Sequence, residues 1–302
     1  MQLLAYIIIY PILWLISILP FRLLYGFSDI VWFFMYRVFK YRKKVVKSNL
    51  RLVFPEKTHR EIEDICAKFY HHLCDMILEA IKSMTISEAS MMKRYKFTNL
   101  ELIKDLEVKK KSIILMCAHY GSWEWIFILQ PQINHKGYAI YKKLTNKYFD
   151  RLVKRIRAKF NSYLITTKET FDVLSESQRN GELTLNGFAS DQSPKHNKAL
   201  HWNEFMGIKV PMHTGAETIA KKFDMAVVFF SVKRLKRGYY QTTFETITET
   251  PEDFKDFEIT DLFFKLVEKQ IHEAPQYYLW THKRWKHRNR VPDGFKKKVF
   301  LV

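Results

Sequence analysis

The chain has 302 residues, with 50 Lys and Arg against 31 Asp and Glu, which gives a formal net charge of +19. Hydrophobic residues make up 47% and aromatic residues 16% of the sequence, so it supports a substantial core and is not that of a disordered protein. The positive charge indicates an anionic partner, either nucleic acid or the phosphate surface of a membrane. Cys66, Cys74 and Cys117 form no disulfide framework, so we expect a reducing compartment.

The chain begins with an uncharged apolar segment. Residues 2–21 carry no charged side chain, and about 20 apolar residues can span the hydrocarbon core of a membrane. Pro11 would kink a helix there, which membranes tolerate. A signal peptide is disfavoured because no Lys or Arg precedes the segment and no small-residue cleavage site follows it. We therefore predict an N-terminal membrane anchor over residues 1–40 that includes Trp14. A helix buried in a soluble protein is the alternative.

Basic residues follow this anchor. Residues 23–39 are rich in aromatic side chains and could lie in the membrane interface. The next cations are Lys40, Arg42, Lys43, Lys44, Lys47 and Arg51. Positive charge after an apolar segment predicts that the main domain, residues 41–302, faces the cytoplasm. We expect Arg42, Lys43 and Lys44 to meet anionic head groups, with a solvated basic helix face as the alternative.

Residues 58–83 have the apolar spacing of a helix that begins with a capping box, Thr58 and Glu61. Several side chains in this stretch could bind zinc, namely Cys66, His71, His72, Cys74 and Asp75. Zinc ligands usually come as two closely spaced pairs. Here the cysteines are eight residues apart and no second pair follows, so we expect packed apolar cysteines and no metal site.

A histidine and a carboxylate flank a predicted strand-to-helix break. Residues 113–117 form an apolar run typical of a buried strand, His119 follows it, and Glu124 comes five residues after His119. On one regular helix the two side chains would point apart, since five residues turn through about 500°. With His119 in the loop and Glu124 in the first helical turn, the carboxylate could orient the imidazole as a general base. We predict a His119–Glu124 catalytic pair.

Strands and helices alternate through the rest of the chain. The expected strands are residues 137–141, 163–166, 182–189 and 225–232, with 239–247 as the hairpin partner of the last. This pattern predicts an α/β domain with a mixed, largely parallel central sheet flanked by helices. Ligands bind outside the carboxyl ends of such strands. His119, Lys142 and Asp191 all fall there, which indicates one site.

Five motifs in order make the chain resemble the late acyltransferases of lipid A biosynthesis, within the lysophospholipid acyltransferase superfamily. The first is the His-x4-acid motif, His119 to Glu124. The others are Tyr141-Lys142-Lys143-Leu144-Thr145-Asn146, Asp191-Gln192, Phe205-Met206-Gly207, and a closing run with Tyr278, Trp280, His282, Arg284, Trp285 and Lys286. The resemblance covers nearly the whole chain and implies a glycerolipid-acyltransferase-like fold behind a membrane-anchoring helix.

The resemblance implies an enzyme that moves a fatty acyl chain from a thioester donor to a hydroxyl of a lipid A precursor. The donor would be acyl carrier protein (ACP) or acyl-CoA, with no metal or other cofactor. The enzyme would work at the inner membrane, with its catalytic domain on the cytoplasmic side. His119 would take the hydroxyl proton, and Glu124 would hold the imidazole. The implied substrate-binding residues are Lys142, Lys143, Asn146, Asp191 and Gln192.

Some of these assignments have alternatives. The family commonly has Arg where this chain has Lys142, and a Lys contacts a phosphate only as a point charge, so Lys143 could be the functional cation. Loop capping is the alternative role for Asn146 and Asp191. The basic aromatic segment 280–288 is expected to anchor at the membrane interface through Trp280 and Trp285, or to form an amphipathic helix.

Two rival functions remain open at the level of the sequence. A lysophospholipid or an amino-acid-containing lipid could supply the hydroxyl, because acceptor selectivity depends on the shape of the pocket. A membrane-tethered protein that binds polyanions would also explain the charge. The sequence has no zinc-finger spacing, RNP-type strand or GXXG loop that would support nucleic-acid binding.

Overall fold

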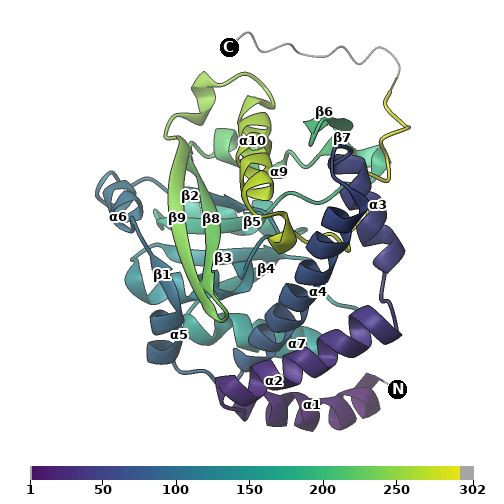
Figure 1. The fold of residues 1–302 in the computed structure, drawn as a ribbon. Helices are drawn as coiled ribbons and strands as arrows, with labels where there is room; N and C mark the ends of the chain where they lie inside the picture. The colour runs from purple at the N-terminus through teal and green to yellow at the C-terminus, as the bar shows by residue number, and fades with distance from the viewer. Residues whose placement is uncertain (1, 293–302) are drawn as a thin grey trace.

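A seven-stranded sheet forms the centre of the protein. The structure, a computed structural model, describes residues 2–292 (Figure 1). The strands lie in the order β1-β9-β8-β2-β5-β3-β4, and neighbouring strands are parallel except for the β8–β9 hairpin. Their bounds are β1 (Tyr95–Phe97), β2 (Ile113–Cys117), β3 (Lys136–Tyr141), β4 (Tyr163–Thr166), β5 (Thr184–Ala189), β8 (Ala226–Lys236) and β9 (Tyr239–Thr248). The predicted mixed, largely parallel sheet is confirmed.

Helices cover both faces of the sheet. Their bounds are α1 (Gln2–Ile18), α2 (Phe21–Trp32), the π-helix η1 (Phe33–Val38), α3 (Lys43–Val53), α4 (His59–Lys82), α5 (Glu88–Arg94), α6 (Glu101–Val108), the 3-10 helix η2 (Trp123–Gln132), α7 (Lys147–Arg157), α8 (Thr170–Arg179), α9 (Gly215–Lys222), α10 (Glu258–Glu273) and the short η6 (Pro275–Tyr277). A separate antiparallel hairpin joins β6 (His201–Phe205) to β7 (Ile208–Met212).

The core divides into two large clusters because successive strand residues face opposite sides of the sheet. Ile114 and Met116 pack in one cluster with residues of α4, α9 and α10. Leu115 and Cys117 belong to the other cluster, which includes residues of α5, α6 and η2. The two faces of β2 therefore contact different sets of helices, and the carboxyl end of β2 emerges between them.

Helix α4 forms as the sequence predicts. The side chain of Thr58 accepts a hydrogen bond from the Glu61 backbone, and the Glu61 carboxylate accepts one from the Thr58 backbone, which completes the capping box. Cys66 and Cys74 are buried, and burial raises their pKa values to about 11 and about 12. Within residues 2–292, no group of three or more His, Cys, Asp or Glu side chains is placed to hold a metal ion.

The apolar N-terminal segment is divided into two helices. α1 ends at Ile18 and α2 begins after Pro20, and the Lys82 ammonium donates to the backbone carbonyls of Ser17 and Leu19 at 2.7 and 2.9 Å. None of the described helices combines the length and the apolar character needed to cross a membrane. The predicted transmembrane helix is therefore not supported.

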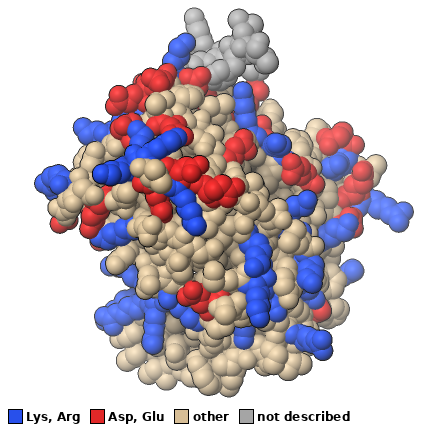
Figure 2. Space-filling model, turned by 90° about the vertical axis from the view of Figure 1, so that its left-hand side faces the viewer, with Lys and Arg blue, Asp and Glu red and all other residues tan. Residues whose placement is uncertain are grey.

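One end of the molecule nonetheless presents many apolar side chains to the surface. The large exposed ones on α1, α2 and η1 include Leu4, Ile7, Ile8, Ile12, Trp14, Leu15, Leu23, Ile30, Phe33 and Phe34. Figure 2 shows that the lower end of the molecule, where α1 and α2 lie in Figure 1, is largely free of charged side chains and has Lys and Arg above it. We call this surface the apolar end.

The C-terminal tryptophans lie in the core and not at the surface. Trp280 and Trp285 are 0% and 1% exposed. Their rings stack on each other with centroids 5.9 Å apart, and Trp285 also stacks on Phe205 at 5.6 Å. The prediction that they anchor the protein at a membrane is wrong, because both rings are buried in the core and do not reach the surface. Residues 280–289 consist mostly of turns, so the predicted alternative of an amphipathic helix is not observed either.

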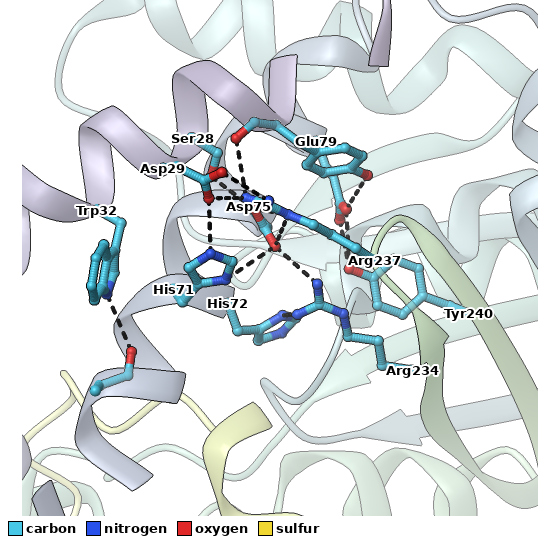
Figure 3. A network of polar contacts seen from close by, with 12 residues as sticks. Ser28, Asp29, Trp32, His71, His72, Asp75, Glu79, Arg234, Arg237 and Tyr240 are labelled. Carbon is cyan, nitrogen blue, oxygen red and sulfur yellow. Dashed lines mark hydrogen bonds and ion pairs between the residues drawn. The ribbon is translucent and has the colours of Figure 1, made fainter. Parts of the chain in front are cut away.

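Hydrogen bonds and ion pairs around a buried carboxylate connect α2 to α4, to β8 and to the turn after it (Figure 3). The Asp75 carboxylate on α4 accepts hydrogen bonds from Ser28 at 2.7 Å, Arg234 at 3.0 Å and Arg237 at 2.6 Å. Arg237 also pairs with Asp29 on α2. Because Asp75 is fully buried, its partners supply the stabilisation that water would otherwise give.

A second buried carboxyl lies one helical turn further along α4. Glu79 accepts hydrogen bonds from the hydroxyls of Tyr25 at 2.8 Å and Tyr240 at 2.9 Å. Burial raises the pKa of Glu79 to about 7. Together the two carboxyl groups hold α2, α4 and the β8–β9 hairpin in one arrangement.

We predict that Asp75→Asn lowers the free energy of unfolding by about 3 kcal/mol or more, because it leaves the largely buried guanidinium of Arg234 without its carboxylate. Urea unfolding followed by tryptophan fluorescence measures the change. Asp64→Asn is the matched control on the same helix. Its pair with Lys68 is exposed on the surface, so its loss should cost under about 1 kcal/mol. Equal effects of the two substitutions would contradict the role given to Asp75.

Candidate active site at the carboxyl edge of the sheet

The register of two strands brings His119 and Asp191 together. Cys117, the last residue of β2, lies opposite Ala189, the last residue of β5. Each chain then runs on for two residues, so His119 and Asp191 leave the same edge of the sheet side by side. His119 Nδ1 lies 2.6 Å from Asp191 Oδ1, and the backbone N–H of His119 donates to the same oxygen at 3.1 Å.

Electrostatics couple this pair. Asp191 is 1% exposed and His119 is 20% exposed, so the carboxylate lies behind the ring and the ring reaches the cavity. Burial by itself would lower the pKa of His119, but the charge and hydrogen bond of Asp191, together with the charge of Glu124, raise it above 6.5. Burial would raise the pKa of Asp191, and its contacts with His119 hold it below 3.8. Asp191 is therefore favoured as the carboxylate, and the imidazole of His119 takes up a second proton more readily than a free histidine does.

The loop that carries His119 is fixed by the C-terminal segment. The backbone N–H of Gly121 donates to Tyr277 at 3.0 Å, and that of Leu279 donates to His119 at 3.1 Å. Gly121 has φ +59°, and a Cβ there would lie 2.9 Å from a methyl carbon of Val232, so both its conformation and its close packing require glycine. These backbone contacts restrict where His119 can place its ring.

The charged network of Figure 3 also reaches this loop. Arg234, which pairs with Asp75, lies with its guanidinium 3.4 Å from His72 Nδ1. Burial and the charge of Arg234 lower the pKa of His72 to about 3, so this histidine is neutral. The ring of His72 packs edge-on against Tyr277 at 4.8 Å and lies beside the backbone of Gly121. The contacts that dock α2 thus continue to the loop of His119.

Glu124 has a different partner from the one predicted. It lies at the start of η2, off the loop of His119 as expected, but its carboxylate accepts from Arg157 Nε at 2.9 Å and forms a second, close contact with Arg157 Nη2. No hydrogen bond joins Glu124 to His119 among the described residues. The prediction that Glu124 orients the imidazole is therefore corrected, because Asp191 occupies that position.

A cavity of about 640 Å³ opens at His119. Glu124, Arg157, Lys142 and Gln192 line it, and most of the remaining wall is apolar. The ring of Trp123 lies edge-on to that of His119, with centroids 5.1 Å apart. The cavity therefore combines a histidine, a fixed guanidinium and space for a hydrocarbon group.

The other predicted substrate-binding residues do not all line the cavity. Lys142 and Lys143 are exposed after β3, and only Lys142 lines the cavity in the described part of the chain. The side-chain oxygen of Asn146 accepts from the backbone of Tyr148 at 3.0 Å and caps α7, which is the alternative that the sequence left open. A role of Lys143 or Asn146 in substrate binding stays a prediction.

Two arginines near the site could not be singled out from the sequence. Arg157 ends a basic helix whose other cations resemble it, so no local pattern distinguishes it. Arg284 belongs to the closing motif but is fully buried, with cation–π contacts to Phe205 and Phe264 at 5.2 Å. Its Nε and Nη1 have no hydrogen-bond partner within residues 2–292, and burial lowers its pKa to about 10.

Comparison with known proteins gives a match over nearly the whole chain. The family model of the bacterial lipid A biosynthesis acyltransferases matches residues 2–287. The lipid A biosynthesis lauroyltransferase of Escherichia coli K12 is 24% identical over 284 residues, which cover 94% of this chain and 90% of that protein. The lipid A biosynthesis palmitoleoyltransferase of the same organism is 22% identical, covering 92% and 89%. A lipid A biosynthesis acyltransferase of Haemophilus influenzae is 24% identical, covering 85% and 82%.

We predict that His119 titrates above its ordinary pKa of 6.5 and that Asp191→Asn lowers its pKa, because the substitution removes the negative charge that favours the imidazolium. NMR titration measures this, with His119→Gln to assign the resonance. Glu124→Gln should lower the pKa as well but by less, since Glu124 acts through charge alone. A pKa that is unchanged in Asp191→Asn would contradict the pairing.

Proposed function

Because the chain belongs to the family of bacterial lipid A biosynthesis acyltransferases, we propose that it transfers a fatty acyl chain from acyl-ACP to a hydroxyl of a lipid A precursor, with His119 as the general base. The observation that supports this proposal most is the contact between His119 Nδ1 and the buried carboxylate of Asp191. With Nδ1 engaged, Nε2 is the nitrogen left for a substrate, and His119 lines the cavity.

The proton transfers follow from this arrangement. Asp191 accepts from Nδ1–H, so Nε2 of His119 carries the lone pair and takes the proton of the acceptor hydroxyl. Asp191 stabilises the imidazolium that results. The alkoxide attacks the thioester carbonyl, and collapse of the tetrahedral intermediate expels the thiolate, which receives the proton from Nε2. The ester product and the free thiol account for all atoms.

Arg157 is suited to the negative charge that develops during this attack. Its guanidinium lines the same cavity as His119 and is held by two contacts to Glu124. A cation fixed in advance stabilises an oxyanion without reorganising during the reaction. We assign Glu124 the role of holding Arg157, in place of the predicted role of orienting His119. Both residues of the His-x4-acid motif then serve catalysis through different partners.

The basic surface has a use in this reaction. The acceptor would carry phosphates, and ACP is an acidic partner, so the surplus of positive charge would attract both. Lys142 at the cavity and the exposed Lys143 beside it are placed to meet a phosphate of the acceptor or of the carrier. This electrostatic attraction should weaken as salt is added.

The apolar end supports association with the inner membrane. Its exposed leucine, isoleucine and aromatic side chains would be costly to keep in water, and patches of this kind mark interaction surfaces. Trp14 is exposed on α1, and Arg42 and Lys44 are exposed near the start of α3, with Lys43 half-buried against the ring of Tyr36. We propose that Trp14 and these cations contact lipid and head groups, with the catalytic domain on the cytoplasmic side.

We predict that His119→Ala loses acyl transfer by at least about 100-fold, since general base catalysis contributes roughly 10²–10⁴-fold. The assay follows transfer from acyl-ACP to a lipid A precursor in detergent. His59→Ala, which changes an exposed histidine on α4, is the matched control and should keep full activity. Wild-type turnover by a folded His119→Ala protein would overturn the assignment.

The acceptor is tested by the lipids of a deletion strain. Loss of one acyl chain from lipid A, restored by the wild-type gene and not by His119→Ala, is the expected result. An unchanged lipid A together with an altered lysophospholipid or aminolipid would move the activity to that acceptor.

We predict that the double variant Ile8→Lys, Ile12→Lys loses binding to vesicles of anionic phospholipid by at least about tenfold, because burial of each isoleucine contributes about 1.5–3 kcal/mol. Co-flotation with vesicles measures the bound fraction. Val108→Lys, at an exposed valine on α6 far along the chain from the apolar end, is the control and should bind at least as well as the wild type. Undiminished binding of the double variant would exclude the apolar end as the membrane contact.

A further inference from the structure

The cavity at His119 continues as a trench over the central strands. Residues in the middle of a covered sheet are normally buried on both faces. Here Ala189 on β5 is exposed, and Gly187 and Ala139 are half-buried although they lie on the neighbouring central strands β5 and β3. The space that exposes them is the cavity itself, since all three residues line it.

Small side chains make the floor of this trench. The strand register places Gly187 between Leu115 on β2 and Ala139 on β3, and Ala189 beside Cys117. Because paired residues share a face, these residues point to the side of the sheet that carries η2. Larger apolar side chains form the walls of the trench, namely Ile126, Phe127, Ile133, Val153 and Phe230.

The trench runs from His119 to the side chain of Gln130, which we call its closed end. It opens at His119, next to Ala189, and extends along β5 to Leu185, four residues or about 13 Å away. At that end the side chain of Gln130 lies against Gly137, where a Cβ would come 1.9 Å from Gln130 Oε1. The amide of Gln130 is held in place by donation to the His135 carbonyl at 2.7 Å.

We infer that this trench holds the hydrocarbon tail of the acyl group that is transferred, and that the lack of a side chain at Gly187 lets the tail extend along the floor as far as Gln130. The inference rests on the proposed acyl transfer and deepens it. The trench leads directly from the catalytic histidine, its wall is apolar, and its far end is closed. A single tail with its carbonyl at His119 fits those three features.

The acceptor fits them less well. Only its reacting hydroxyl has to reach Nε2 of His119, whereas the tail of the donor is attached directly to the carbonyl that reacts there. The closed end also gives a limit to length. A tail that extends beyond Leu185 meets the fixed amide of Gln130, which would lose favourable contacts if a methylene group were pressed against it.

Gly187 offers a clean way to change the trench. A Cβ at this position would lie 3.6 Å from the Tyr138 carbonyl, an ordinary contact, and would meet no other atom within 4 Å beyond its chain neighbours. Valine is favoured in strands, so Gly187→Val is expected to fold. Its methyl groups would fill the trench about halfway between His119 and Leu185.

The test measures kcat/KM of the full-length enzyme for a series of saturated acyl-ACP donors from octanoyl to palmitoyl. Relative to the wild type, Gly187→Val should lower kcat/KM for the longest good donor by roughly tenfold or more and spare the shortest, since single methylene groups in such pockets are worth about that factor. Gly187→Ala should give a smaller shift in the same direction. Ile133→Ala, which enlarges the trench near its closed end, should shift the preference towards longer donors.

Each outcome decides a different claim. An equal loss on all donors, or an unchanged length profile in a folded Gly187→Val protein, would overturn the trench as the acyl site. A profile that changes with the acyl chains of the acceptor and not with those of the donor would assign the trench to the acceptor and overturn the inference. If the wild type transfers no acyl group from any donor, the proposed function fails, and that result is distinct from all of these.

Discussion

The contact between His119 and Asp191 is the interaction on which the site depends. It follows from the pairing of β2 with β5, whose last residues lie opposite each other and whose chains both continue for two residues. A shift of one residue in that register would turn every side chain of one strand to the opposite face of the sheet and separate the pair. The parallel sheet therefore does more than support the site. It determines which carboxylate meets the imidazole.

The surroundings of this pair are as constrained as the pair itself. The loop of His119 is hydrogen-bonded to the segment at Tyr277. His72 packs against Tyr277, and Arg234 contacts His72. Arg234 belongs to the network around Asp75 that also holds α2. A connected set of polar contacts thus joins the helices at the apolar end to the loop of His119. Under the proposed function, this connection would keep the apolar end in a fixed position relative to His119.

Much of the fold could be predicted from the sequence, because apolar runs and their breaks are local signals. The strands at 163–166 and 239–248 and the capping box of Thr58 follow from such patterns. The convergence of His119 and Asp191 at one edge also follows, since both come directly after strands. The partner of the imidazole could not be predicted. His119 and Asp191 are 72 residues apart in the chain, and only the strand register shows that they touch.

Composition does not predict the role of a residue where that role depends on burial. Trp280 and Trp285 stand among cations, a pattern typical of a membrane interface, yet the rings pack on Phe205 inside the core. Their basic neighbour Arg284 is buried with them. Glu124 has the spacing of a carboxylate that orients His119, but it accepts a hydrogen bond from Arg157, which lies on a helix later in the chain. In each case a long-range contact overrides a local pattern.

The central claim is that His119 and Asp191 act as one catalytic unit. A double-mutant cycle of His119→Ala and Asp191→Asn, measured as kcat for acyl transfer at a pH above the His119 pKa, tests it most directly. If Asp191 acts through the imidazole, the double variant will be no slower than His119→Ala alone, because effects within a unit are not additive. Losses that multiply in the double variant would show that the two residues act independently and would contradict the account.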